Sequence, residues 1–374
     1  MTIMNRVAAI ASAQTELRPA WSGAQHIDLI STVVSQVFKG TGLTLDDVDF
    51  VFDSGSDVLD GRSISNCGFL GALGAHHKEE SRIEEDGLWA ALYGVAKISS
   101  GAADLGLIVA YSKPSESDIN LFYSTQCEPF YQRPVGFDHR AASGLQAQRY
   151  LAQHGLGELD LARITAKRWR DAARRGTVQI ESPPSAQDVL ASGNVAAPLK
   201  ALMMSRPVDG AVAVLLASAE IAHRVCRTPV WITGLGASMD RHSFAARASG
   251  ALEACAVAAE RAYATAGWKG PQKSSVVEVS ASSAASECMV LESIGLARPG
   301  RAIDLLDDDA TPINLSGGSL PADPVMATGL VRLSEARRQL SIPSDYGIEA
   351  PKSAIVHGAG GVGMQTHCVL TLEV

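Results

Sequence analysis

Two glycine-rich blocks near the C-terminus decide the fold: NLSGGSLPADPVMATG at residues 314–329 and HGAGGVG at residues 357–363. Each block holds a pair of adjacent glycines, and glycine adopts backbone conformations that other residues avoid. A run of helical period lies between the two blocks. The pattern indicates two sharp loops that help to fold the core and that carry the polar side chains of Asp323 and His357.

Working outward from these blocks, apolar runs of strand length alternate with longer segments of helical period, which is the pattern of a layered α/β fold. The expected strands are residues 7–10, 48–52, 105–110, 211–217, 230–235, 276–279, 354–356 and 368–372. The expected helices are residues 27–38, 87–99, 251–266, 287–294 and 326–340. Gly101 follows the second helix, where a helix stop is expected.

The order of these elements repeats, which predicts a duplicated fold of two similar halves, each with a mixed sheet and covering helices. We place the first half at residues 1–225 and the second at residues 226–374. Residues 112–198 interrupt the first half with mixed proline, aromatic and charged residues, and we interpret them as an inserted loop domain. Insertions of this kind commonly build the substrate site.

Length and composition are those of a globular protein with a sizeable core: 374 residues, 46% hydrophobic and 19% charged. The formal net charge is −8, and phosphate binding needs clustered lysine and arginine, so a general nucleic-acid surface is not expected. One basic run extends from Lys167 to Arg175. We interpret it as a solvated helix face in preference to a site for an anionic ligand.

Six cysteines are scattered without any Cys-x-x-Cys pair, so we expect neither a metal site nor a disulfide framework, and a reducing cytoplasm fits best. The apolar run within residues 1–10 is too short for the core of a signal peptide. No segment reaches the roughly 18 uninterrupted apolar residues that a membrane span requires, so no contact with a membrane is expected.

The two glycine-rich blocks closely resemble the paired C-terminal signatures of the thiolase superfamily. There, Asn-x-x-Gly-Gly leads to a Gly-His-Pro run, and a later Cys-x-Gly-Gly-Gly-x-Gly closes the active site. Two more segments resemble the family in the same order: GAADLGLIVA at residues 101–110, and Pro-Leu at 198–199 followed by DGAVA at 209–213. Ala110 replaces the usual last glycine of the first segment. The chain is more similar to the lipid-transfer-protein branch than to the degradative thiolases.

The resemblance implies three catalytic positions, and each carries a different side chain here. Glu84 stands where the family has its nucleophilic cysteine, at the start of a helix, Asp323 stands at the family's histidine, and His357 at its acid/base cysteine. The segment from Ser280 to Ser283 replaces a turn that holds a water molecule in the family. The resemblance further assigns substrate-binding positions to Asp86, Ser280, Gly317, Gly318, Gly360 and Gly361.

Three interpretations stay open. In the first, Glu84, Asp323 and His357 converge on a coenzyme A thioester, with Glu84 as general base or electrostatic element, His357 as its acid/base partner and Asp323 orienting. Such a set suits making or breaking a carbon–carbon bond, by acyl transfer or retro-aldol cleavage, without a cysteine nucleophile. In the second, the site has decayed, and the chain is a structural or regulatory subunit of a heteromeric thiolase whose paralogous subunit carries the cysteine. The third is an acyl-CoA or lipid carrier without chemistry.

The resemblance also implies partners. A dimer of thiolase folds is expected, formed with a second copy or with a paralogous subunit. In this branch a small protein with a zinc ribbon and an OB-fold is often a second companion. The expected substrate is an acyl-CoA, and no cofactor is expected to be bound by this chain itself.

Overall fold

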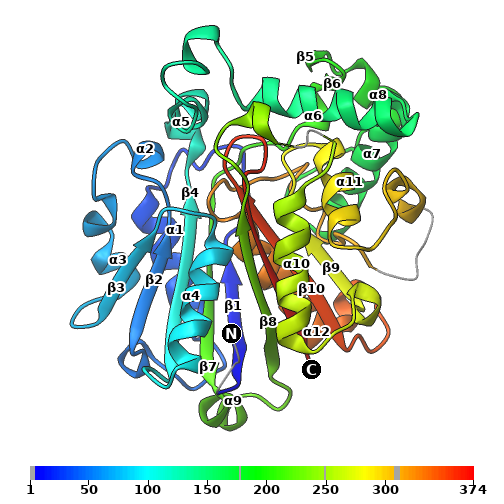
Figure 1. Cartoon of the computed structure of the whole chain (residues 1–374). Helices are drawn as coiled ribbons and strands as arrows, with labels where there is room; N and C mark the ends of the chain where they lie inside the picture. The colour runs from blue at the N-terminus through cyan, green and yellow to red at the C-terminus, as the bar shows by residue number, and fades with distance from the viewer. Residues whose placement is uncertain (1–4, 177, 248–249, 307–311) are drawn as a thin grey trace.

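A nine-stranded mixed sheet runs through the molecule in the order β3-β2-β4-β7-β1-β8-β11-β10-β9 (Figure 1). The structure is a computed structural model and describes residues 5–176, 178–247, 250–306 and 312–374. The strands are β1 (Val7–Gln14), β2 (Phe50–Ser54), β3 (Glu79–Ile83), β4 (Leu105–Ser112), β7 (Gly210–Ser218), β8 (Val230–Met239), β9 (Val276–Val279), β10 (Ser353–Gly360) and β11 (Thr366–Glu373).

Strand pairing repeats on the two sides of the sheet. In the first half β1 is antiparallel to β7, β7 is antiparallel to β4, and β4 is parallel to β2. In the second half β8 is antiparallel to β11, β11 is antiparallel to β10, and β10 is parallel to β9. The halves join where β1 pairs with β8. This arrangement confirms the predicted fold class, while the boundary at residues 225 and 226 stays a prediction.

Two helices at the centre pack against each other and against strands of both halves: α4 (Gly87–Ser99) and α12 (Thr328–Ser341). The first turns of α4 are buried almost completely, as expected of a helix that is apolar on all sides. The opposite face of the sheet is covered by α1 (His26–Val37) in the first half and by α10 (Glu253–Ala266) with α11 (Ala284–Ser293) in the second.

The expected strands and helices agree with the structure, apart from shifts at their ends. Strand β3 and the short helices α2 (Asp57–Asp60), α3 (Leu70–Leu73) and α9 (Ala219–Val225) were not expected. Helix α11 begins three residues earlier than expected, at Ala284, because the Ser283 side chain caps it by accepting a hydrogen bond from the Ser286 amide. Strand β3 has polar, partly exposed residues that carry no apolar pattern. It pairs with β2 at the edge of the sheet.

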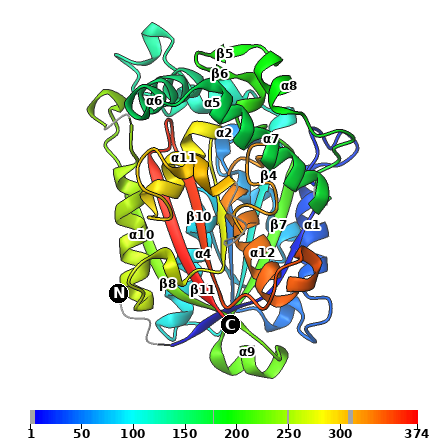
Figure 2. The same ribbon diagram turned by 90° about the vertical axis from the view of Figure 1, so that its right-hand side faces the viewer.

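The segment between β4 and β7 is mainly helical rather than loop-like. It contains α5 (Ile119–Thr125), α6 (His139–His154), α7 (Glu158–Arg175), α8 (Ala186–Ala191) and a short hairpin of β5 (Asn194–Ala196) and β6 (Leu199–Lys200). Helices α5, α6 and α8 lie with the hairpin at one end of the sheet (Figures 1 and 2). The site described below forms beneath them.

The basic run on α7 differs from the solvated helix face that we expected. Arg168 is buried and donates to Glu287 at 2.6 Å, with Asp171 at 3.2 Å from the same guanidinium. Arg175 pairs with Glu335 at 3.1 Å. Such guanidinium groups need partners, so Arg168 and Arg175 anchor α7 to the core, while Arg170 and Arg174 are exposed.

No helix among the described residues is long and apolar enough to cross a membrane. All six cysteines lie in the described ranges and are free thiols. Residues 1–4 of the N-terminal apolar run lie outside the described residues, and β1 begins at Val7.

Close packing of α10 on β8 depends on Gly236. A Cβ atom at this position would lie 1.8 Å from the carbonyl oxygen of Ala258 on α10. We expect Gly236→Ala to lower the free energy of unfolding by about 3 kcal/mol, because backbone must move to admit the methyl group. Urea unfolding measures the change. Gly23→Ala is the matched control, because a Cβ there meets nothing within 4 Å, and an equal loss in both variants would contradict the packing argument.

Candidate active site

A pocket of about 790 Å³ opens where the N-terminal end of α4 meets α5, α6 and the glycine loop after β10. Small-molecule sites in proteins commonly have volumes of about 300–1,000 Å³. Residues from both halves of the fold and from the helical segment line this pocket. Those that carry polar or titratable groups include Glu84, Glu85, Asp86, Tyr123, His139, Ser280 and Asp323.

Asp86 joins the first turns of α4 and α12 at the pocket. It caps α4, because its Oδ1 accepts the Leu88 amide at 3.0 Å, and its Oδ2 accepts the Gly329 amide of α12 at 2.8 Å. Burial raises the pKa of this carboxyl to about 7, although both amide bonds favour the charged form. Both oxygens are thus committed to backbone amides, so Asp86 positions two helices rather than offering a free base.

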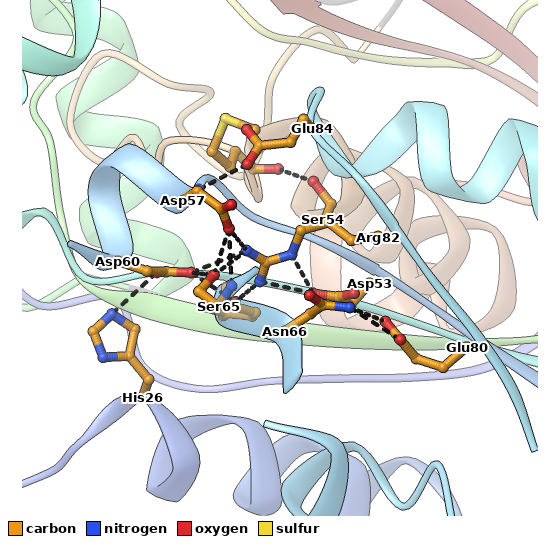
Figure 3. A network of polar contacts seen from close by, with 12 residues as sticks. His26, Asp53, Ser54, Asp57, Asp60, Ser65, Asn66, Glu80, Arg82 and Glu84 are labelled. Atoms are coloured by element: carbon orange, nitrogen blue, oxygen red, sulfur yellow. Dashed lines mark hydrogen bonds and ion pairs between the residues drawn. The ribbon is translucent and has the colours of Figure 1, made fainter. Parts of the chain in front are cut away.

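Glu84 lies in the turn between β3 and α4, at the exposed side of the pocket. One of its oxygens accepts the backbone amide of Asp57 at 2.7 Å. Figure 3 shows the network beneath it, in which Arg82 lies among Asp53, Asp57 and Asp60, with N···O distances of 3.0–3.2 Å. The second Glu84 oxygen has no partner in the hydrogen bonds of the described residues, so this carboxylate is available to a ligand.

Glu85 is the carboxylate that sequence reasoning passed over. It is half-buried, and its Oε2 accepts a hydrogen bond of 3.0 Å from the Thr366 hydroxyl on β11. A Cβ at Gly360 would lie 2.8 Å from the same oxygen, so the side chain points at the glycine loop. Burial raises the pKa of Glu85. Three consecutive acidic residues gave no indication of which one faces inward.

Asp323 reaches the pocket from the turn before α12. Its carboxylate is buried and accepts a hydrogen bond from the Thr328 hydroxyl. Burial raises its pKa, and the bond from Thr328 opposes that shift. The structure therefore places Glu84 and Asp323 around one pocket, with Glu85 as a third carboxylate.

His357 does not lie in this pocket. It is fully buried in β10, and its Nε2 atom is 3.0 Å from Nδ1 of His367 on β11. Successive residues of a strand face opposite sides of the sheet. Gly358 faces Asp86 and α4, so His357 faces the other way, towards α10. The structure thus does not support the predicted convergence of His357 with Glu84 and Asp323.

Some of the predicted substrate-binding residues line the pocket, and others do not. Gly360 and Gly361 line the pocket, and so does Ser280, whose buried hydroxyl has no hydrogen-bond partner among the described residues. Gly317 and Gly318 do not line it. A Cβ at Gly317 would lie 2.4 Å from that of Ala172 on α7, so this pair shapes a tightly packed loop instead.

Two aromatic residues from the helical segment, Tyr123 and His139, also line the pocket, and no motif in the sequence marked them. Tyr123 on α5 stacks on His139 of α6, with ring centroids 4.1 Å apart. Burial lowers the pKa of His139 to about 4, so its imidazole is neutral at physiological pH. Burial and, to a smaller degree, the charge of Asp323 raise the pKa of Tyr123, so its phenol stays protonated as a donor.

Thiol groups are missing from the pocket wall. All six cysteines are described, and none is among the residues that line the pocket. Cys368 lies against α4, where its Sγ is 3.8 Å from the Leu88 carbonyl oxygen, but it is fully buried and burial raises its pKa. A buried thiol of raised pKa is a poor nucleophile.

Comparison with known proteins shows what this chain is similar to. Residues 236–373 match the family described as thiolase C-terminal domain-like. This part of the chain is therefore similar to a thiolase C-terminal domain. Over the whole length, this thiolase-like chain is 25% identical to an acetyl-CoA acetyltransferase of Methanocaldococcus jannaschii, in a match that covers 96% of the chain and 97% of the relative.

Solved structures show that the thiolase fold extends beyond this domain. An Ltp2-ChsH2(DUF35) aldolase superposes with a TM-score of 0.85 at 19% identity, covering 100% of this chain and 99% of that one. A monomeric SCP2-thiolase-like protein type 1 from Mycobacterium smegmatis superposes with a TM-score of 0.77 at 17% identity, covering 100% and 78%. At these identities the likeness concerns the fold alone.

The free energy of unfolding should depend on pH through the buried carboxyl of Asp323. Its pKa is higher in the folded protein than in the unfolded chain, where it is about 4. The protonated carboxyl therefore contributes its full stability below pH 4, and this contribution is lost as the pH rises through the pKa of the folded state. We expect Asp323→Asn, which can still accept from Thr328, to flatten the fall in unfolding free energy between pH 4 and neutrality. Thr328→Val removes a bond that lowers this pKa and should extend the fall to higher pH. Urea unfolding as a function of pH measures both, and parallel curves for all three proteins would contradict this account.

Proposed function

We propose that this thiolase-like chain binds acyl-CoA thioesters and makes or breaks a carbon–carbon bond without a covalent acyl-enzyme. The observation that carries the proposal is the pocket wall itself. It presents the carboxylates of Glu84, Glu85 and Asp323 together with Tyr123 and His139, and no cysteine of the chain lines it. Ordinary thiolysis needs a thiolate nucleophile. Proton transfer needs only positioned acids and bases.

A coenzyme A thioester is supported as the substrate class by the relatives. The Methanocaldococcus jannaschii protein, which aligns over almost the whole chain, is called an acetyl-CoA acetyltransferase. The pocket is large enough for an acyl group, and it is partly walled by the glycine loop that holds Gly360 and Gly361. Arg140 at its exposed rim offers a positive charge to an anionic part of such a ligand.

The reaction class that fits best is retro-aldol cleavage of a β-hydroxyacyl thioester, or its reverse. Glu85 is the base we assign, because burial raises its pKa towards the range in which a carboxylate accepts a proton readily. It takes the proton of the β-hydroxyl as the bond between Cα and Cβ breaks. The electron pair moves into the thioester enolate, and Cβ leaves as a carbonyl compound. Protonation of Cα completes the cleavage.

Two other groups that line the pocket suit the enolate oxygen. The Tyr123 phenol stays protonated and the His139 imidazole is neutral, so each can donate a hydrogen bond without a charge to neutralise. We assign Glu84, which is held by the Asp57 amide, as the electrostatic element at the exposed side. Asp323 orients the neighbouring groups from its bond to Thr328.

Assembly and location follow from the same resemblance and are proposals as well. We propose a dimer of thiolase folds, and a small companion protein of the zinc-ribbon and OB-fold type, in the cytoplasm. One similar structure is that of an Ltp2-ChsH2(DUF35) aldolase, whose title names a second component. A partner of this kind would complete the pocket from its exposed side.

The test is turnover of a β-hydroxyacyl-CoA by the chain purified together with whatever companion it retains. We expect Glu85→Gln to lower kcat about 100-fold or more, because a positioned base contributes about that much. Glu79→Gln is the matched control, since Glu79 lies on β3 in an exposed ion pair with Lys97 and does not line the pocket. It should keep full activity. Glu84→Ala should also lose turnover while folding normally.

One result would favour the alternative function. If a complex in which Glu84, Glu85 and Asp323 are all replaced by amides keeps its activity, the chemistry belongs to a paralogous subunit. This chain would then be a structural or regulatory subunit of a heteromeric thiolase.

A further inference from the structure

Away from the pocket, three side chains with metal-binding atoms meet inside the second half of the fold. They are Cys255 on α10, His357 on β10 and His367 on β11, all of them buried. Their ligand atoms all lie within 4.8 Å of one another. The sequence spreads these residues over more than a hundred positions without any spacing typical of a metal site, so no motif predicted the cluster.

One buried nitrogen atom of this cluster lacks a hydrogen-bond partner among the described residues. His357 and His367 share one hydrogen bond of 3.0 Å between Nε2 and Nδ1. The Nδ1 atom of His357 is buried and has no hydrogen-bond partner among the described residues. Around them lies the apolar core formed by residues such as Val279, Ile355 and Val369. An unsatisfied buried polar group costs roughly 1–3 kcal/mol, so these side chains are a costly arrangement in an apolar core.

We propose that Cys255, His357 and His367 bind a single thiophilic closed-shell cation, Cu⁺ in preference to Zn²⁺. One thiolate and two neutral imidazoles are ligands that both ions accept. The Cys255 thiol would lose its proton on binding the ion, as metal-bound cysteines do.

Charge and ligand number favour Cu⁺. The group of ligating residues found in the described structure has three members, whereas structural Zn²⁺ sites almost always have four protein ligands. Cu⁺ with one thiolate is neutral overall, while Zn²⁺ with the same ligands would leave a net positive charge in an apolar core. An uncompensated charge in such surroundings is costly.

Bound metal would act on the pocket through the backbone. The cluster ties α10 to β10 and β11, and β10 leads directly into Gly360 and Gly361 at the pocket wall. The Ser280 amide, from another lining residue, donates to the His357 carbonyl oxygen at 3.1 Å. The ion is therefore a structural clamp behind the glycine loop and has no contact with substrate. Since its ligands are fully buried, the chain acquires the ion while it folds.

The experiment is to refold the full chain anaerobically with Cu⁺ or with Zn²⁺ and remove unbound metal. Elemental analysis gives the stoichiometry, X-ray absorption gives the ligands, and thermal unfolding gives the effect on Tm. We expect one Cu⁺ per chain with one sulfur and two nitrogen neighbours, and a higher Tm for the loaded protein. Cys255→Ser should reduce retained copper at least about 10-fold. Cys288→Ser is the matched control, a buried thiol of the same core outside the cluster.

Each other outcome would overturn the proposal. Failure of the wild type to retain stoichiometric metal, or equal retention by Cys255→Ser, would show that the cluster is not a binding site. Retention of Zn²⁺ in preference to Cu⁺ would overturn the assignment of the ion. His367→Asn provides a second variant, checked by circular dichroism for a native fold, and it must lose copper as Cys255→Ser does.

Discussion

The buried carboxylate of Asp86 is the interaction on which the site depends. With one oxygen on the Leu88 amide and the other on the Gly329 amide, it joins the N-terminal ends of α4 and α12, one from each half of the duplicated fold. A second link runs from the Gly87 amide to the Met326 carbonyl oxygen at 2.7 Å. Only glycine fits at Gly329 and Gly358, because a Cβ at either would lie within 2.5 Å of the same carboxylate oxygen. The same carboxylate of Asp86 therefore both positions the two helices and requires glycine at these two positions.

Upon this junction the chain builds a thiolase fold. Carboxylates lie just before α4, and the phenol and imidazole that line the same pocket come from helices between β4 and β7. Burial raises the pKa of Glu85 and Asp323 and lowers that of His139. The wall therefore combines carboxylates with neutral donors, which is the pairing that the proposed enolate chemistry requires.

Sequence reasoning predicted the fold well, because strand-length apolar runs and paired glycines have direct backbone consequences. The site was predicted in part. Glu84 and Asp323 reach the pocket, but His357 lies on the other face of β10, since a shift of one residue along a strand reverses the direction of its side chain. Tyr123 and His139 could not be found, because only the packing of α5 and α6 over the sheet brings them to the site.

A crystal structure with a non-cleavable β-hydroxyacyl-CoA analogue would show which side chains meet the reacting atoms. We expect the β-hydroxyl to lie within hydrogen-bond reach of Glu85, about 2.6–3.2 Å, and the thioester oxygen to face Tyr123 or His139. An acyl chain bound away from these residues, or no binding to a folded chain with its companion present, would contradict the claim that this pocket carries the chemistry.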